Sequence, residues 1–262
     1  MQFLAKSHEN YKELVWRLAK TDFKLRYHQS VLGYFWAILK PLLMFTILNF
    51  VFSTLFHLGG VNNPYYPLEL LTGLLMFNFF SEGTMTGMMS LVSKAQLVTK
   101  IYVPRWTIVL GSTMNALFVF CMNLIVLVLF FFIYQKIPTL SGIIMFLVYA
   151  ILLYILIIAF SFLTAPFFVR FRDLSMIWEV FLSVLMYLAP IVYPLSLVPE
   201  RFRQIFLLNP LAFIINFSKQ GLISNNFTSG WHFLTLLLSV IIVFAVSFLI
   251  FKKSEKKVAE FI

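Results

Sequence analysis

The stretch Gly142-Ile-Ile-Met-Phe-Leu-Val-Tyr-Ala-Ile-Leu-Leu-Tyr-Ile-Leu-Ile-Ile-Ala-Phe-Ser-Phe-Leu-Thr-Ala165 contains no charged residue. An apolar run of about 20 residues is long enough to cross the hydrocarbon core of a bilayer as a helix. Similar runs recur from Ala37 to Phe251, and the 262-residue chain is 61% hydrophobic and only 11% charged. This composition leaves no room for a soluble catalytic domain of ordinary size. We therefore expect an all-α integral membrane protein.

Six apolar segments are expected to cross the membrane. They lie at about 37–57, 70–90, 106–134, 142–165, 177–195 and 231–251. The preceding residues 1–36 form a cytoplasmic and interfacial amphipathic region, and residues 252–262 form a cytoplasmic tail.

The segment 196–223 is expected to be re-entrant. Asn209 and Pro210 interrupt it, and Pro190 and Pro194 break the span before it. Proline lacks a backbone N–H and breaks the helix, so some backbone groups lose their helical hydrogen-bond partners. At membrane depth such non-helical backbone is tolerated only where protein groups or a water-filled cavity supply the missing hydrogen bonds. We expect this segment to face the bundle interior or the outer mouth.

The positions of the basic residues favour six crossings with both termini in the cytoplasm. This arrangement places 15 of the 20 Lys and Arg residues inside, as the positive-inside rule requires. Lys136, Arg201 and Arg203 then lie outside, and Lys40 and Lys219 lie near or within apolar segments. Seven crossings would place the lysines of the tail outside the cytoplasm. The N-terminal region also lacks the apolar core of a secretory signal, so we expect it to stay cytoplasmic.

The N-terminal region has the pattern of an amphipathic helix. Apolar side chains recur there at i, i+3, i+4 and i+7, at Tyr11, Leu14, Val15 and Leu18. The helix is expected to lie in the headgroup plane, with an ordinary surface helix as the alternative. The chain has a net charge of +10. We expect its basic residues, which lie beside the apolar spans, to interact with anionic lipid headgroups, and we expect no nucleic acid partner.

A signature follows this helix. The run from Arg26 to Trp36 resembles the R-Y-x-x-S-x-L-G-x-x-W signature of ABC-2 type permeases of bacterial polysaccharide exporters. The matching residues are Arg26, Tyr27, Ser30, Leu32, Gly33 and Trp36. The resemblance covers essentially the whole chain and continues through Lys100 to Arg105, Phe171-Arg172-Asp173, Ala189-Pro190-Ile191-Val192-Tyr193 and Asn209-Pro210.

The resemblance implies a function and partners. Members of this family export O-antigen, capsule or wall teichoic acid chains on a polyprenyl diphosphate carrier across the bacterial plasma membrane, pairing two permeases with two separate ATPase subunits. The chain contains no G-x-x-x-x-G-K-[ST] motif, so ATP and Mg²⁺ are expected on the partner subunit. No catalytic residue and no cofactor of its own are expected. A homodimer is expected because two copies double the wall available for a hydrated glycan.

By the same resemblance, the inside connection from Ser93 to Arg105 looks like the family's coupling helix, which docks on the ATPase. It is long enough for a short helix before Pro104. The residues expected to couple to the ATPase are Lys94, Gln96, Lys100, Tyr102, Pro104 and Arg105, together with Arg172 and Asp173 in the second inside connection. A basic loop held by lipid phosphates is the alternative for the first connection, and a local salt bridge for the second.

Glu82 lies in the middle of the second span, where an ionised carboxylate is costly, so it should face a partner or a wet cavity. A neutral, hydrogen-bonded Glu82 near Ser81, Thr84 or Thr86 is the alternative. The candidate translocation path comprises Glu82, Phe77, Phe79, Phe80, Tyr187 and Tyr193. Asn115 and Asn123 are expected to form a polar stripe that faces another helix.

Other classes remain as alternatives. A drug or lipid exporter of the ABC-2 class shares the six-span plan. An integral-membrane enzyme of polyprenol-linked glycan metabolism would need clustered acidic or histidine residues, and an ion-coupled transporter would need several intramembrane charges. The acidic residues here are scattered, Cys121 is the one cysteine, and His57 lacks a companion, so neither a disulfide nor a metal site is expected.

Overall fold

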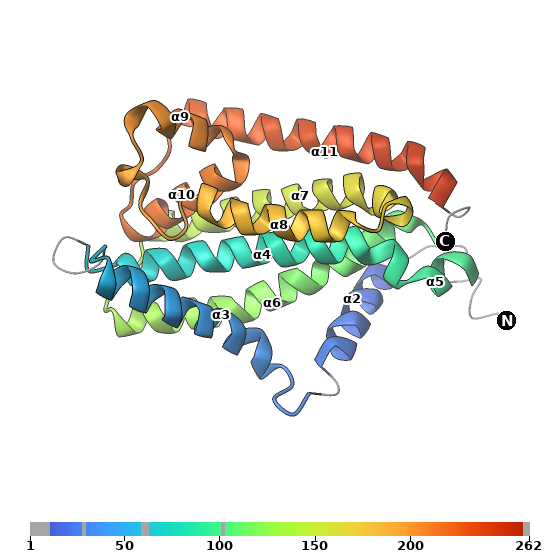
Figure 1. The fold of residues 1–262 in the computed structure, drawn as a ribbon, viewed down its shortest axis with the longest axis horizontal. Helices are drawn as coiled ribbons and strands as arrows, with labels where there is room; N and C mark the ends of the chain where they lie inside the picture. The colour runs from blue at the N-terminus through green and yellow to red at the C-terminus, as the bar shows by residue number, and fades with distance from the viewer. Residues whose placement is uncertain (1–10, 28–29, 59–62, 101–102, 259–262) are drawn as a thin grey trace.

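The computed structural model describes residues 11–27, 30–58, 63–100 and 103–258. These residues fold mainly into helices, and Figure 1 shows the long ones running side by side. In chain order the elements are α2 (Tyr11–Tyr27), α3 (Phe35–Asn49), the π-helical turn η2 (Phe50–Leu55), α4 (Tyr66–Ser93), α5 (Ala95–Lys100), α6 (Arg105–Ile133), α7 (Leu140–Arg170), α8 (Leu174–Leu188), the 3-10 turn η3 (Leu195–Leu197), α9 (Glu200–Leu208), α10 (Pro210–Ile223) and α11 (Gly230–Val258).

Helix α4 is the centre of the bundle. It packs against α6, α7 and α10, and α11 packs on the far side of α7. Most of the α4 side chains are buried. The short α5 lies at the same end of the bundle as the last turns of α11, while α9 and α10 lie at the opposite end (Figure 1). The two ends of the molecule therefore have different structures.

Four helical segments in the described part of the chain are long and apolar enough to cross a membrane. They are Phe35–Leu55, Arg105–Ile133, Leu140–Arg170 and Gly230–Glu255, and the bent pair of α9 and α10 would make a fifth. Helix α4 is equally long but carries Glu69 and Glu82 and lies among its neighbours. Helix α8 has 15 residues, or about 22 Å, which is shorter than the hydrocarbon core. The count of six crossings stays a prediction.

Two helix ends differ from the predicted ends of the membrane spans. The fifth span was expected to reach residue 195, but α8 ends at Leu188, because the residue before Pro190 is pushed out of the helical region and Ala189 has ψ of 143°. Helix α11 continues to Val258, past the predicted end of the sixth span at residue 251, and the start of the cytoplasmic tail at residue 252 stays a prediction. By contrast, α6 spans Arg105–Ile133, within one residue of the prediction.

The segment after α8 is bent, as its sequence suggested. Helices α9 and α10 meet at 107°. Asn209 caps α10, because its side chain accepts a hydrogen bond from the backbone N–H of Leu211 at 3.0 Å, and Pro210 occupies the first turn, where no donor is needed. Most of α10 is buried against α7 and α4. The predicted inward orientation agrees with this burial, and its depth in the membrane stays a prediction.

Two glycines on α4 allow three helices to approach closely. A Cβ atom on Gly87 would lie 2.0 Å from Oγ of Ser161 in α7 and 2.8 Å from Cγ2 of Thr113 in α6. One on Gly83 would lie 2.7 Å from Cγ2 of Ile157. The sequence Gly83-Thr-Met-Thr-Gly87 is thus a G-x-x-x-G contact of the kind found between membrane helices.

Candidate functional site

Helix α2 packs along the first half of α6. The rings of Tyr11 and Trp106 meet edge to face with centroids 5.7 Å apart, and those of Phe23 and Phe118 do so at the same distance. The two helices therefore run in the same direction. The predicted amphipathic helix is present, and part of its apolar face contacts protein. Its placement in the headgroup plane stays a prediction.

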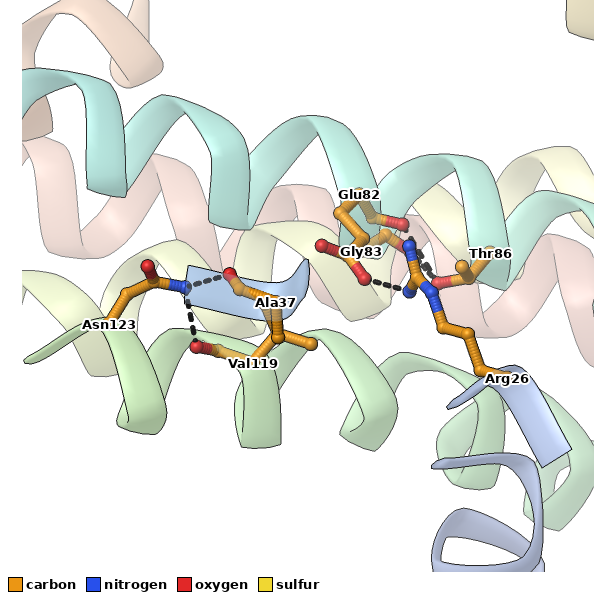
Figure 2. Close-up of polar contacts among 7 residues, drawn as sticks. All are labelled: Arg26, Ala37, Glu82, Gly83, Thr86, Val119 and Asn123. Carbon is orange, nitrogen blue, oxygen red and sulfur yellow. Dashed lines mark hydrogen bonds and ion pairs between the residues drawn. The ribbon is translucent and has the colours of Figure 1, made fainter. Parts of the chain in front are cut away.

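An ion pair joins the end of α2 to the middle of α4. Arg26 donates from Nη1 to Oε1 of Glu82 (Figure 2). The side chain of Arg26 is 39% exposed and that of Glu82 is 21% exposed, so the pair is only partly shielded from solvent. The hydroxyl of Thr86 donates to the backbone carbonyl of Glu82 at 2.8 Å and leaves the carboxylate to Arg26. Glu82 was expected either to face a partner or a wet cavity, or to be a neutral, hydrogen-bonded side chain. The contact with Arg26 supports the first interpretation, with a charged partner.

A second ion pair joins α2 to the start of the connection between α4 and α6. Nζ of Lys94 lies 2.5 Å from Oδ2 of Asp22 and donates to Oγ of Ser112 at 3.2 Å. The side chain of Lys94 is 12% exposed. Lys94 therefore binds α2 and α6 within this chain, and a contribution to the ATPase contact would be indirect.

The rest of this connection has the expected form. Helix α5 ends at Lys100, and Pro104 precedes the first residue of α6 with an extended ψ of 124°. Gln96 is exposed on α5 and Arg105 is half-buried at the start of α6. The predicted contact residue Tyr102 lies outside the described residues. Whether this surface binds an ATPase stays a prediction.

In the second connection, Arg172 and Asp173 are both exposed. The guanidinium of Arg172 lies 5.7 Å from the ring centroid of Phe168 in α7. The backbone carbonyl of Asp173 accepts from the N–H of Ile177 at 3.1 Å and so begins α8. The two residues thus order the turn between α7 and α8.

The signature residues build the turn from α2 into α3. Tyr27 is the last residue of α2, and the N–H of Gly33 donates to the carbonyl of Ser30 at 3.0 Å. Gly33 has φ of +47°, which glycine adopts without steric cost. Leu32 and Trp36 are exposed. Gly33 thus allows the turn over residues 30–34 that leads into α3.

Asn123 holds the start of α3 against α6. Its Nδ2 donates to the carbonyl of Ala37 at 3.1 Å and to that of Val119 at 2.8 Å (Figure 2). Asn115 is also buried on α6. The prediction that a polar side chain on this helix faces another helix is confirmed for Asn123.

The candidate path residues fall into two groups. Phe77, Phe79 and Phe80 are buried; Phe79 stacks on Phe120 with centroids 4.5 Å apart. Phe77 and Phe79 fill the core of the chain, and Phe80 lines an open apolar cavity together with Trp178 and Leu185. Tyr193 donates from its hydroxyl to the carbonyl of Tyr187 at 2.6 Å, and Tyr187 is 61% exposed. A glycan path lined by these residues stays a prediction.

Sequence reasoning missed three contributions to this arrangement. The role of Asp22 was not foreseen, nor were the close contacts of Gly83 and Gly87, although their G-x-x-x-G spacing was visible in the sequence. Lys219 was noted only as a cation in an apolar segment, and it is in fact buried. Within the described ranges, no three His, Cys, Asp or Glu side chains gather closely enough to hold a metal ion.

The chain is similar to known membrane transport proteins along most of its length. Two O-antigen export system permease proteins RfbA of Klebsiella pneumoniae are 31% and 30% identical to it over 244 and 243 residues. Each match covers 93% of this chain and 92% of the relative. An O-antigen export system permease protein RfbA of Myxococcus xanthus is 27% identical to this chain, in a match that covers 77% of this chain and 76% of the relative.

The ABC-2 type transporter family matches residues 13–223. These residues contain most of α2 with its two ion pairs to α4 and Lys94, the central α4, and the bent pair of α9 and α10. The match therefore includes both ends of the bundle and the site described above. On this match and on the similarity to the Klebsiella permeases, the chain belongs to the ABC-2 type transporter family and is a multi-pass membrane protein.

Proposed function

We propose that this chain is the permease subunit of an ATP-driven exporter that moves a polyprenyl-diphosphate-linked polysaccharide out of the cytoplasm. The glycan would be of the O-antigen, capsule or wall teichoic acid type, and the membrane would be the bacterial plasma membrane. The observation that carries this proposal is the description of the two Klebsiella relatives as O-antigen export permeases, at 93% coverage of this chain.

The exporter is a homodimer with two ATPase subunits, which bind ATP and Mg²⁺. The packing of the single chain supports this assembly, because Phe77, Phe79 and Phe120 fill its core. A hydrated glycan needs a wider route than a filled bundle offers. A seam between two copies supplies it, and exposed apolar side chains such as Ile47 of α3 and Val180 of α8 are available at the surface for such a contact.

The ion pairs give a route for mechanical coupling. Movement of α5 by an ATPase subunit acts directly on Lys94 at the end of α4. Lys94 pulls on Asp22 of α2, and Arg26 at the end of α2 acts on Glu82 in the middle of α4. The short α5 is thus linked to a charged contact at the middle of α4. We infer that closure of the ATPase subunits moves α2 and α4 together.

The test is purification of the tagged chain from its membranes in mild detergent. We expect a P-loop ATPase to copurify in equal amount, and its activity to respond to polyprenyl-diphosphate glycans. Inverted membrane vesicles should take up the lipid-linked glycan with ATP and not with a non-hydrolysable analogue. If the Gln96→Cys variant forms no crosslink to an ATPase subunit and the chain purifies alone, the proposal is contradicted. A response to other lipids or drugs instead of glycans would favour a drug or lipid exporter.

A further inference from the structure

Lys219 is a buried cation in the apolar helix α10. The side chain is 4% exposed. Its Nζ donates to the backbone carbonyl of Pro190 and lies 3.5 Å from that of Ile191, both in the segment that follows α8. A buried ammonium is costly unless its donors are satisfied. Here the donors meet carbonyl oxygens at the place where the helix is broken.

The break after α8 creates the need for these donors. The backbone leaves the helix at Ala189, so the carbonyls that follow have no helical partner. Ala189, Ile191 and Val192 are each at most 1% exposed. Carbonyl groups buried among apolar side chains must find donors within the protein.

Tyr66, at the start of α4, supplies another donor to the same segment. Its hydroxyl donates to the carbonyl of Val192 at 2.6 Å, and the ring is 2% exposed. Lys219 and Tyr66 thus bind the carbonyls of three consecutive residues, Pro190, Ile191 and Val192, from two different helices. We call this arrangement the carbonyl clasp.

The surroundings of Lys219 are shaped to admit it. A Cβ atom on Gly73 would lie 3.3 Å from Cδ of Lys219 and 3.5 Å from Cα of Ile191, so glycine leaves the space that the lysine stem fills. Glu69, one helical turn before Gly73, attracts the ammonium electrostatically. Helix α10, which carries Lys219, lies at the end of the bundle opposite α5 (Figure 1).

We propose that Lys219 is a positioning residue that holds the segment after α8 against α4 and α10 and so keeps this end of the permease closed at rest. This inference rests on the proposed function for its direction, since the end opposite α5 is the outer end only if α5 meets a cytoplasmic ATPase. The contacts on which it depends lie within one chain.

Cysteine accessibility tests the clasp without requiring export. Val192→Cys is introduced with Cys121→Ala, and the full exporter is labelled in intact cells with a membrane-impermeant maleimide. With the clasp intact, Cys at 192 should react slowly. Lys219→Met keeps the unbranched side chain up to Cε and removes its donors. Labelling should then become about tenfold faster, the order of effect of losing a hydrogen bond from a charged donor. Tyr66→Phe should give a smaller change in the same direction.

Two controls separate positioning from a general loss of structure. Lys136→Met removes a cation at the same end, one that lies over the ring of Tyr65, and should leave labelling unchanged. Lys219→Arg keeps charged donors and should return labelling toward the slow rate. If Lys219→Met assembles normally and labels no faster, or if Lys219→Arg labels as fast as Lys219→Met, the inference is overturned.

The two proposals can fail separately. Fast labelling of the Lys219→Met variant in a chain that exports no glycan would keep the clasp and overturn the proposed function. Normal export of glycan together with slow labelling in every variant would keep the proposed function and overturn the clasp. Labelling that occurs only in inverted vesicles would retain the clasp as a contact and overturn its assignment to the outer end.

Discussion

Arg26, the penultimate residue of α2, forms an ion pair with Glu82, 56 positions later and in the middle of α4. A carboxylate in the middle of an apolar helix is costly without a counter-charge. Arg26, near the C-terminal end of α2, provides that charge to Glu82 of α4. The pair therefore connects the N-terminal helix with the interior of the bundle.

Glu82→Gln should destabilise the chain more than the double variant Arg26→Gln with Glu82→Gln. The single variant removes the counter-charge that Glu82 gives to Arg26, at a cost of about 1 to 2 kcal/mol after allowance for the exposure of the pair. Thermal unfolding in detergent measures the four states of the double-mutant cycle. Strictly additive effects would show that the two residues do not interact.

Breaking the pair between Asp22 and Lys94 should uncouple ATP hydrolysis from export. Asp22→Asn is expected to leave the ATPase of the complex active and to reduce export several-fold, because the link from α5 to α2 is lost. Exchange of the charges, Asp22→Lys with Lys94→Asp, should restore part of the export. Lys20→Gln is the matched control, since Lys20 is exposed on the same helix. Equal loss of hydrolysis and export in Asp22→Asn would argue against coupling.

Gly87→Ala should strongly reduce the stability of the bundle. The added Cβ would lie 2.5 Å from Cβ of Ser161, so α4 must move away from α7, at a typical overpacking cost of about 1 to 3 kcal/mol. Gly230→Ala has nothing within 4 Å of its Cβ and should be neutral. Yield and melting temperature of the purified variants give the comparison, and a stable Gly87→Ala protein would refute the close helix contact.

Gly33→Ala should destabilise the turn between α2 and α3 by about 1 kcal/mol, because its φ of +47° is unfavourable for a residue with a Cβ atom. Gly33→Asn should be tolerated better, since asparagine enters this region more readily. Melting temperatures of the two variants decide the matter. If alanine and asparagine behave alike, the backbone angle is not the reason for this glycine.

The orientation of the chain can be tested with single cysteines in a Cys121→Ala background. Ser141→Cys at the start of α7 should react with an impermeant maleimide from outside intact cells, and Lys253→Cys near the end of α11 should react only after the membrane is opened. Both residues are exposed. The basic residues near the tail favour the cytoplasmic side. The opposite labelling pattern would invert the proposed direction of transport.

The sequence by itself determined the membrane class and several helices. The uncharged run from Gly142 to Ala165 lies wholly within α7, and α6 matches its predicted bounds within one residue. Pro190 and Pro194 marked a break that the structure confirms. These features depend on local causes, because apolar length, charge and proline act on the residues that carry them or on near neighbours.

Only the tertiary structure decided which residues meet. The pairs Arg26 with Glu82 and Asp22 with Lys94 are 56 and 72 positions apart, and Tyr66 lies 126 positions from Val192. Hydrophobic periodicity reports which face of a helix avoids water, and it contains no information on which helix will cover that face. The packing of α2 along α6, and of α4 against α6 and α10, selected these partners, because contacts between helices depend on their packing in space.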